Sequence, residues 1–134
     1  MILEFEGRWR GPKSLGAATL GTAWAAIGTA RVGGARWYGA FLDVTVHDSV
    51  DMRFRLRGAY EAGGSAYYMP IATISQSEVT IEDEYAEFNV DANQKQMVVW
   101  ELAGICPYCT LEGSVGTAGG TAATLDTSHI VTGI

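Results

Sequence analysis

Residues 50–60, VDMRFRLRGAY, decide the fold class of this chain. Two kinds of side chain alternate along them, the apolar Val50, Met52, Phe54 and Leu56 and the charged Asp51, Arg53, Arg55 and Arg57. An alternation of period two places the two kinds on opposite faces of a β-strand. The stretch therefore predicts a half-buried strand of an antiparallel sheet, with one face in a core and the other in water or against a partner.

The rest of the chain is also typical of a small all-β domain. Its 134 residues suit one domain with one core, 48% of them are hydrophobic, and the 17 glycines suit turns and bulges. Further strands are expected over residues 36–46, 67–74, 79–90, 96–102, 105–115 and 125–132. The short link after residue 46 makes residues 36–46 the expected antiparallel neighbour of residues 50–60. We predict a single antiparallel β-sandwich or jelly-roll-like domain over residues 1–134, with about seven to nine strands.

The N-terminal part of the chain leaves alternatives open. Residues 2–10 alternate weakly, which suits an extended arm or an edge strand, and residues 11–16 are expected to form a loop. Residues 1–16 are therefore a candidate N-terminal arm. Residues 15–27 contain alanines that suit a helix, but glycines interrupt them, so an extended segment is the favoured prediction.

The charge of the chain narrows the classes of partner. The net charge is −6 at pH 7, and general nucleic-acid binding is not expected because phosphate neutralisation needs a basic surface. The same charge disfavours an anionic membrane surface. No run of about 18 apolar residues is present, so no transmembrane helix is predicted.

The arginine stripe formed by Arg53, Arg55 and Arg57 has two interpretations. Arginine is enriched at protein interfaces and pairs with carboxylates through two hydrogen bonds, so the stripe could be a contact surface. Alternatively, it is a solvated sheet face whose arginines meet the acidic residues of 82–87 on a neighbouring strand. The second interpretation is favoured, because exposed sheet faces are usually charged.

The motif Cys106-Pro107-Tyr108-Cys109 resembles the redox motif of glutaredoxins over four residues. The chemistry there needs the first thiol at a helix N-terminus, and the glycine-rich residues that follow have no helical period. A strand over residues 105–115 is the favoured prediction, and it would place Cys106 and Cys109 on opposite faces. The acidic run lacks the spacing of a calcium loop, and His47 and His129 match no zinc pattern with the cysteines. We predict no catalytic, metal or cofactor residue, and no enzyme.

The aromatic residues also have two interpretations. The sequence contains six tyrosines and four tryptophans, which are Trp9, Trp24, Trp37 and Trp100. Exposed and coplanar, such rings could form a sugar-binding face. Aromatic residues inside strands are more often part of the core, so the core is the favoured prediction.

The composition and pattern of the whole sequence resemble those of small virion proteins of tailed bacteriophages, and most of all those of capsid decoration, or cement, proteins. The resemblance rests on the segment ILEFEGRWR, the loops GTARVGG and SVGTAGGT, and the strands ending in SHIVTGI. It implies a non-enzymatic homo-oligomer, most often a trimer, that sits on the outside of the virion capsid, binds the major capsid protein and stabilises the shell. Multivalent binding to a repeating lattice would add avidity to modest contacts.

Such a protein needs a contact patch, and the candidates are the apolar Ile2, Leu3, Phe5 and Trp9 together with the arginine stripe. The alternatives are a phage tail, neck or fibre protein, a carbohydrate-binding β-sandwich module, and a thiol oxidoreductase with a reactive Cys106.

Overall fold

The computed structural model describes residues 9–45, 50–61, 67–68, 80–81, 85–90, 93–102, 107–116 and 123–133. Within these residues all regular structure is β. The strands are β1 (Trp9–Ser14), β2 (Ala18–Leu20), β3 (Ala25–Arg31), β4 (Trp37–Thr45), β5 (Val50–Ala59), β6 (Tyr67–Tyr68), β7 (Thr80–Ile81), β8 (Ala86–Val90), β9 (Gln94–Glu101), β10 (Tyr108–Val115) and β11 (Ala123–Gly133).

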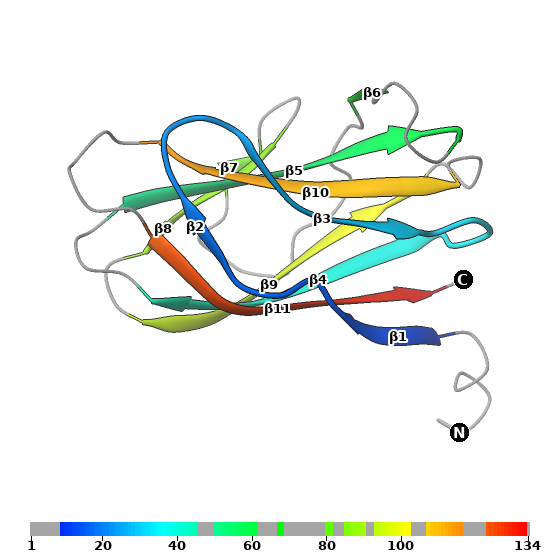
Figure 1. Ribbon diagram of the computed structural model, residues 1–134, viewed down its shortest axis with the longest axis horizontal. Helices are drawn as coiled ribbons and strands as arrows, with labels where there is room; N and C mark the ends of the chain where they lie inside the picture. The colour runs from blue at the N-terminus through cyan, green and yellow to red at the C-terminus, as the bar shows by residue number, and fades with distance from the viewer. Residues whose placement is uncertain are drawn as a thin grey trace.

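The strands form two antiparallel sheets that lie face to face (Figure 1). Sheet A has the order β1-β11-β4-β9, with β2 also paired to β11. Sheet B has the order β3-β10-β5-β8-β7, with β6 paired to β5. The predicted antiparallel β-sandwich is confirmed. The described residues hold more strands than the expected seven to nine, because short segments such as β2, β6 and β7 pair separately.

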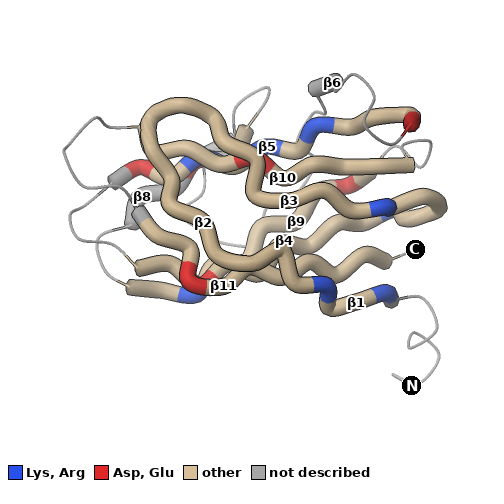
Figure 2. Tube along the Cα trace, in the orientation of Figure 1, with Lys and Arg blue, Asp and Glu red and all other residues tan. Residues whose placement is uncertain are grey.

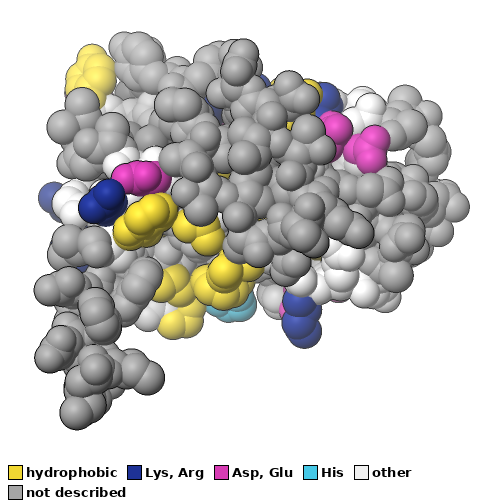
Figure 3. Space-filling model, turned by 180° about the vertical axis from the view of Figure 1, so that it is seen from behind, with side chains coloured by type: hydrophobic (Ala, Val, Ile, Leu, Met, Phe, Trp, Pro, Cys, Tyr) yellow, Lys and Arg dark blue, Asp and Glu magenta, His cyan; other side chains and the backbone are white. Residues whose placement is uncertain are grey.

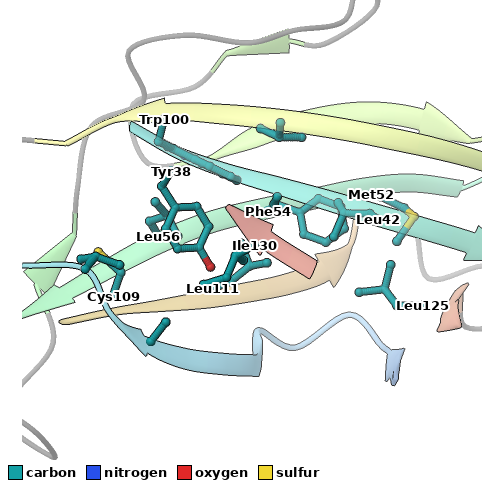
Figure 4. Close-up of a cluster of buried hydrophobic side chains, with 14 of the residues drawn as sticks. Tyr38, Leu42, Met52, Phe54, Leu56, Trp100, Cys109, Leu111, Leu125 and Ile130 are labelled. Atoms are coloured by element: carbon teal, nitrogen blue, oxygen red, sulfur yellow. The ribbon is translucent and has the colours of Figure 1, made fainter. Parts of the chain in front are cut away.

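The core lies between the inner faces of the two sheets, where alternate residues of each strand meet (Figure 4). In β5, Met52, Phe54 and Leu56 are fully buried, as the alternation predicts. Across from them, Tyr38 of β4 and Trp100 of β9 are also fully buried, and their rings meet edge to face with centroids 5.9 Å apart. Burying one such large side chain contributes on the order of 2–3 kcal/mol, so these rings are a main source of stability.

The predicted pairing of residues 36–46 with residues 50–60 is wrong. Strand β4 lies between β11 and β9 in sheet A, whereas β5 lies between β10 and β8 in sheet B. The chain therefore changes sheets between Thr45 and Val50. Alternation fixes which face of a strand is buried, but it does not name the neighbouring strand, and two strands facing each other across a core show the same pattern.

The structure also resolves the alternatives near the N-terminus. Residues 15–27 contain β2 and the start of β3, so the extended prediction is confirmed over these strands. Trp9–Ser14 is the edge strand β1, paired to β11, which means that the loop expected over residues 11–16 is wrong for its first part. A register shift between Arg10 and Lys13 contains Pro12, which suits an edge strand because proline has no N–H to offer another strand. Residues 1–8 of the candidate arm lie outside the described residues.

Two further expectations need revision. The strand expected over residues 79–90 is instead β7 and β8, which pair with each other in antiparallel fashion, so the chain reverses between them. The strand expected around Cys109 is confirmed over Tyr108–Val115, and Cys109 is a buried thiol on the core face beside Leu111. Cys106 lies outside the described residues, so the predicted opposite placement of the two cysteines stays a prediction.

Candidate ligand-binding face

The outer face of sheet A carries an ordered set of cross-strand rows, which we call the binding face. Its central strand is β4, whose inward residues are buried and whose outward residues are Trp37, Gly39, Phe41 and Asp43. Strands β9 and β11 flank β4 on its two sides. The register places one residue of each flanking strand beside each outward residue of β4.

Four rows result, and their chemistry changes along the strand. The rows are Lys95–Asp43–Thr127, Met97–Phe41–His129, Val99–Gly39–Val131 and Glu101–Trp37–Gly133. One end is polar, the middle is aromatic and apolar, and the far end carries an indole beside a carboxylate. Directly opposed residues lie about 4.5–5.5 Å apart, so each row acts as one contact unit.

Gly39 leaves a gap in the middle of this face. Trp37 and Phe41 lie four residues apart, which is about 13 Å along a strand, and the residue between them on the same face has no side chain. The result is a hollow of about 250 Å³ between the two rings, lined by Trp37, Gly39, Phe41, Met97, Val99 and Val131.

A second hollow of about 240 Å³ lies on the polar side of Phe41. It is lined by Phe41, Leu42, Asp43, Lys95, Gln96, Met97, Thr127 and His129. The two hollows share Phe41 and Met97. Phe41 is 44% exposed, which is unusual for so large an apolar side chain, and Figure 3 shows apolar side chains gathered next to a histidine on this side of the molecule. Phe41 therefore stands as an exposed ring between two hollows of different chemistry.

The polar end is held in place by hydrogen bonds. Lys95 Nζ donates to Asp43 Oδ1 at 2.7 Å, and the Thr127 hydroxyl donates to Asp43 Oδ2 at 3.1 Å. These two hydrogen bonds, from Lys95 first and then Thr127, hold the pKa of Asp43 below its ordinary value. Asp43 is therefore an ionised acceptor at neutral pH, and it is flanked by the ammonium of Lys95, whose side chain is 84% exposed.

The other end carries a second ion pair. Arg36 Nη2 lies 3.0 Å from Glu101 Oε1, and the Arg36 guanidinium lies 5.6 Å from the centre of the Trp37 ring. This contact restrains the indole at the edge of the apolar hollow. An aromatic surface with a few fixed polar groups beside it is the usual make-up of a site for a small amphipathic ligand.

The arginine stripe lies elsewhere, on the outer face of sheet B, and its predicted solvation is wrong for Arg55. Only 7% of Arg55 is exposed, and its Nε donates to Glu112 Oε1 at 2.7 Å. Arg57 Nη1 lies 3.7 Å from the other oxygen of Glu112. The Trp24 ring covers Arg55 at 4.1 Å and lies 5.1 Å from Arg53.

The acid that pairs with the stripe comes from β10. Figure 2 shows basic and acidic positions close together on β5 and β10, and Glu112 lies opposite Arg55 in the register. The predicted run over residues 82–87 contributes Glu87, which is the Cα partner of Arg53 on β8. The sequence could not show that β10, from more than fifty residues later in the chain, would be the neighbour that neutralises the stripe.

The other predicted contact residues are only partly placed. Ile2, Leu3 and Phe5 lie outside the described residues, and Trp9 is placed by its backbone at the start of β1. The core prediction for the tryptophans is confirmed for Trp100 and is wrong for Trp24 and Trp37, which are half-buried on the two outer faces. Alternation within residues 36–46 could have revealed Trp37, Gly39 and Phe41 on one face, but not the strands beside them.

Among the described residues, no group of three or more His, Cys, Asp or Glu side chains is placed to hold a metal ion. The part of the chain that the structure describes also contains no helix of the length and apolarity needed to cross a membrane.

Comparison with known proteins gives little guidance. No protein-family model matches the sequence, and no curated protein matches it. Among solved structures, the chain is similar to the CBM22-1 xylan-binding domain from Paenibacillus barcinonensis Xyn10C, with 12% sequence identity and a TM-score of 0.46. The match covers 92% of this chain and 96% of that domain. At this level of similarity it says nothing about what this chain binds.

Proposed function

We propose that this protein is a non-enzymatic carbohydrate-binding β-sandwich whose ligand lies on the binding face of sheet A. The observation that carries the proposal is the exposed Phe41 ring, which stands between an apolar hollow and a hollow lined by Asp43, Lys95 and His129. A sugar ring has an apolar C–H face and an edge of hydroxyl groups. The C–H face suits an aromatic side chain, and the hydroxyl edge suits fixed donors and acceptors.

The polar groups have the chemistry that hydroxyl groups require. The Asp43 carboxylate is an acceptor, the Lys95 ammonium is a donor, and the Thr127 hydroxyl can accept a hydrogen bond while it donates to Asp43. Because Lys95 and Thr127 already hold Asp43, the carboxylate does not have to be ordered when the ligand binds. Preorganisation of this kind reduces the entropic cost of binding.

The test is a glycan panel followed by titration calorimetry on two matched variants. Phe41→Ala should weaken binding of the selected glycan by about tenfold or more, which corresponds to about 1.4 kcal/mol. Tyr60 is the other large exposed hydrophobic side chain among the described residues, so Tyr60→Ala is the control and should leave the affinity unchanged. A protein that binds no glycan, or two variants that lose affinity equally, would exclude this site.

A second candidate function is the capsid decoration protein that the sequence resembles. The observation that favours it is the apolar middle of the binding face, where Phe41, Met97 and Val99 form a surface suited to a protein partner. Under this proposal the protein forms a homo-oligomer, with a trimer as the expected state, and binds the major capsid protein on the outside of the shell.

Co-sedimentation with undecorated capsids separates the two candidates. Binding to capsids that stabilises them against heat, and that Phe41→Ala abolishes, supports the decoration function. Glycan binding in the absence of any capsid binding supports the first proposal alone.

A further inference from the structure

We infer that the apolar hollow beside Gly39 is a subsite for an acetyl group, so that the ligand is an N- or O-acetylated glycan. This inference rests on the proposed carbohydrate-binding function and specifies the class of sugar. The two hollows share Phe41, so a single ring seated there can reach both. The polar hollow suits the hydroxyl groups of the sugar, so the apolar hollow must hold a different chemical group of the ligand.

The lining of the apolar hollow disfavours a hydroxyl group, because it offers few hydrogen-bond partners. Among its six lining residues, Trp37 carries the one strong side-chain donor, the indole N–H, and the thioether of Met97 is at most a weak acceptor. The backbone groups of the central strand β4, including those of Gly39, are engaged in the sheet ladders with β9 and β11. A hydroxyl group placed there would lose its hydrogen bonds to water at a cost of roughly 1–3 kcal/mol.

An acetyl group fits the same lining. Its methyl group needs only apolar contacts, which Val99, Val131 and Phe41 provide. Its carbonyl oxygen needs a donor and offers none, which matches a lining that has one N–H and no strong acceptor among its side chains. The hollow therefore has the polarity of an acetyl group rather than of a bare sugar ring.

Gly39 makes the hollow and also provides the means of testing it. A Cβ atom at Gly39 would lie 3.6 Å from Phe41 Cε2 and 3.6 Å from the Val131 carbonyl oxygen, which are ordinary contacts. Gly39→Ala therefore fills part of the hollow without forcing its neighbours apart. Gly21, where a Cβ would meet nothing within 4 Å, provides the matched control Gly21→Ala at a remote site.

The experiment measures affinities for two matched pairs of ligands. Tetra-N-acetylchitotetraose and cellotetraose share one β-1,4-linked backbone and differ by an acetamido group in place of a hydroxyl on each ring. Native acetylated xylan and the same xylan after alkaline deacetylation form the second pair. The unmodified protein should bind the acetylated member of at least one pair about tenfold more tightly. Gly39→Ala should reduce that ratio toward one, because it weakens binding of the acetylated member more than binding of the deacetylated member. Gly21→Ala should leave the ratio unchanged.

A second variant keeps the test independent of any effect of Gly39→Ala on folding. Val99→Thr keeps the branched shape that a strand favours and introduces a hydroxyl into the lining of the hollow. Val99→Thr should reduce the ratio of the affinities for the acetylated and deacetylated ligands, because the threonine hydroxyl can hydrogen-bond to a hydroxyl group of the deacetylated ligand. If glycans bind but neither pair shows a preference for acetylation, the inference is overturned and the proposed function stands. If neither pair nor any other glycan binds, both are overturned.

Discussion

At the scale of single residues, Tyr38 is a tyrosine in a position that suits phenylalanine. Its ring is fully buried against Trp100, and among the described residues its hydroxyl has no hydrogen-bond partner. Burial raises the pKa of this hydroxyl well above its ordinary value, so the group stays neutral. A buried hydroxyl without a partner costs roughly 1–3 kcal/mol.

Tyr38→Phe should therefore leave the free energy of unfolding unchanged or raise it by about 1 kcal/mol. Urea denaturation followed by tryptophan fluorescence measures the change. Tyr38→Leu is the comparison that removes the ring, and it should destabilise the protein because the edge-to-face contact with Trp100 is lost. A clear loss of stability in Tyr38→Phe would mean that the hydroxyl has a partner outside the described residues.

Also at this scale, the two arginines that share Glu112 should differ in their contribution to stability. The side chain of Arg55 is 9% exposed and lies 2.7 Å from Glu112, whereas that of Arg57 is 28% exposed and lies 3.7 Å away. Removing one member of a buried ion pair leaves the other charge without its main partner. Arg55→Ala should cost roughly 2–4 kcal/mol, and Arg57→Ala roughly 1 kcal/mol or less.

A double-mutant cycle isolates this pair from the packing of Arg55 under Trp24. The variant that combines Arg55→Met with Glu112→Met should be more stable than either single change, because the buried charges of Arg55 and Glu112 are then removed together. Additive effects of the two changes would contradict the assignment of Glu112 as the partner of Arg55.

At the scale of the elements, β10 is the strand in which close packing is most demanding. It lies between β3 and β5 in sheet B, and a Cβ atom at Gly113 would come within 2.8 Å of Leu20 Cδ1 and 3.2 Å of Phe54 Cε1. Gly113→Ala should therefore destabilise the sandwich by about 1–3 kcal/mol through overpacking. Gly21→Ala, at a position with open space, is the control and should change the stability little. Equal thermal midpoints of the two variants would refute the close approach of β2 and β5 to β10.

The elements also show what could be predicted from sequence and what could not. The inward face of β5 could be predicted, because Phe54 belongs to a clear alternation that the core confirms. The inward face of β9 could not be predicted in this way, because Met97, Val98, Val99 and Trp100 are all apolar. The neighbours of β4 and β5 could not be predicted either, since Thr45 and Val50 stand close in the chain and lie in different sheets. Strand pairing depends on which strands meet in the folded chain, and the alternation within one strand does not predict its neighbour.

At the scale of the whole molecule, the candidate site is a product of topology. It joins β4, β9 and β11, so that Asp43 lies between Lys95 and Thr127, from two strands much later in the chain. No local sequence motif predicts the row Lys95–Asp43–Thr127. The arginine stripe, in contrast, is conspicuous in the sequence and forms a partly buried ion-pair cluster with Glu112. The arginine stripe and the candidate site therefore lie on opposite faces of the sandwich.

The edge strand β1 gives the last prediction, which concerns the integrity of the whole sandwich. A chain beginning at Trp9 keeps β1, and one beginning at Leu15 lacks it, so the difference between the two reports on β1 alone. The pairing of Lys13 with Ile130 and of Ser14 with His129 would be lost, and the β11 backbone along that side would be left unpaired. We expect the shorter chain to melt at least about 5 °C lower, since 1–2 kcal/mol shifts the midpoint of a domain of this size by several degrees.

The shorter chain should also self-associate, because an unpaired strand edge is a template for pairing with a second chain. Calorimetry measures the melting point, and size-exclusion chromatography with light scattering measures the mass. If both truncated chains melt together and stay equally monodisperse, β1 is an appendage rather than part of the sandwich. Under the decoration proposal the N-terminal segment would then be a second contact with the capsid, and truncation at Leu15 should weaken capsid binding while leaving glycan binding intact.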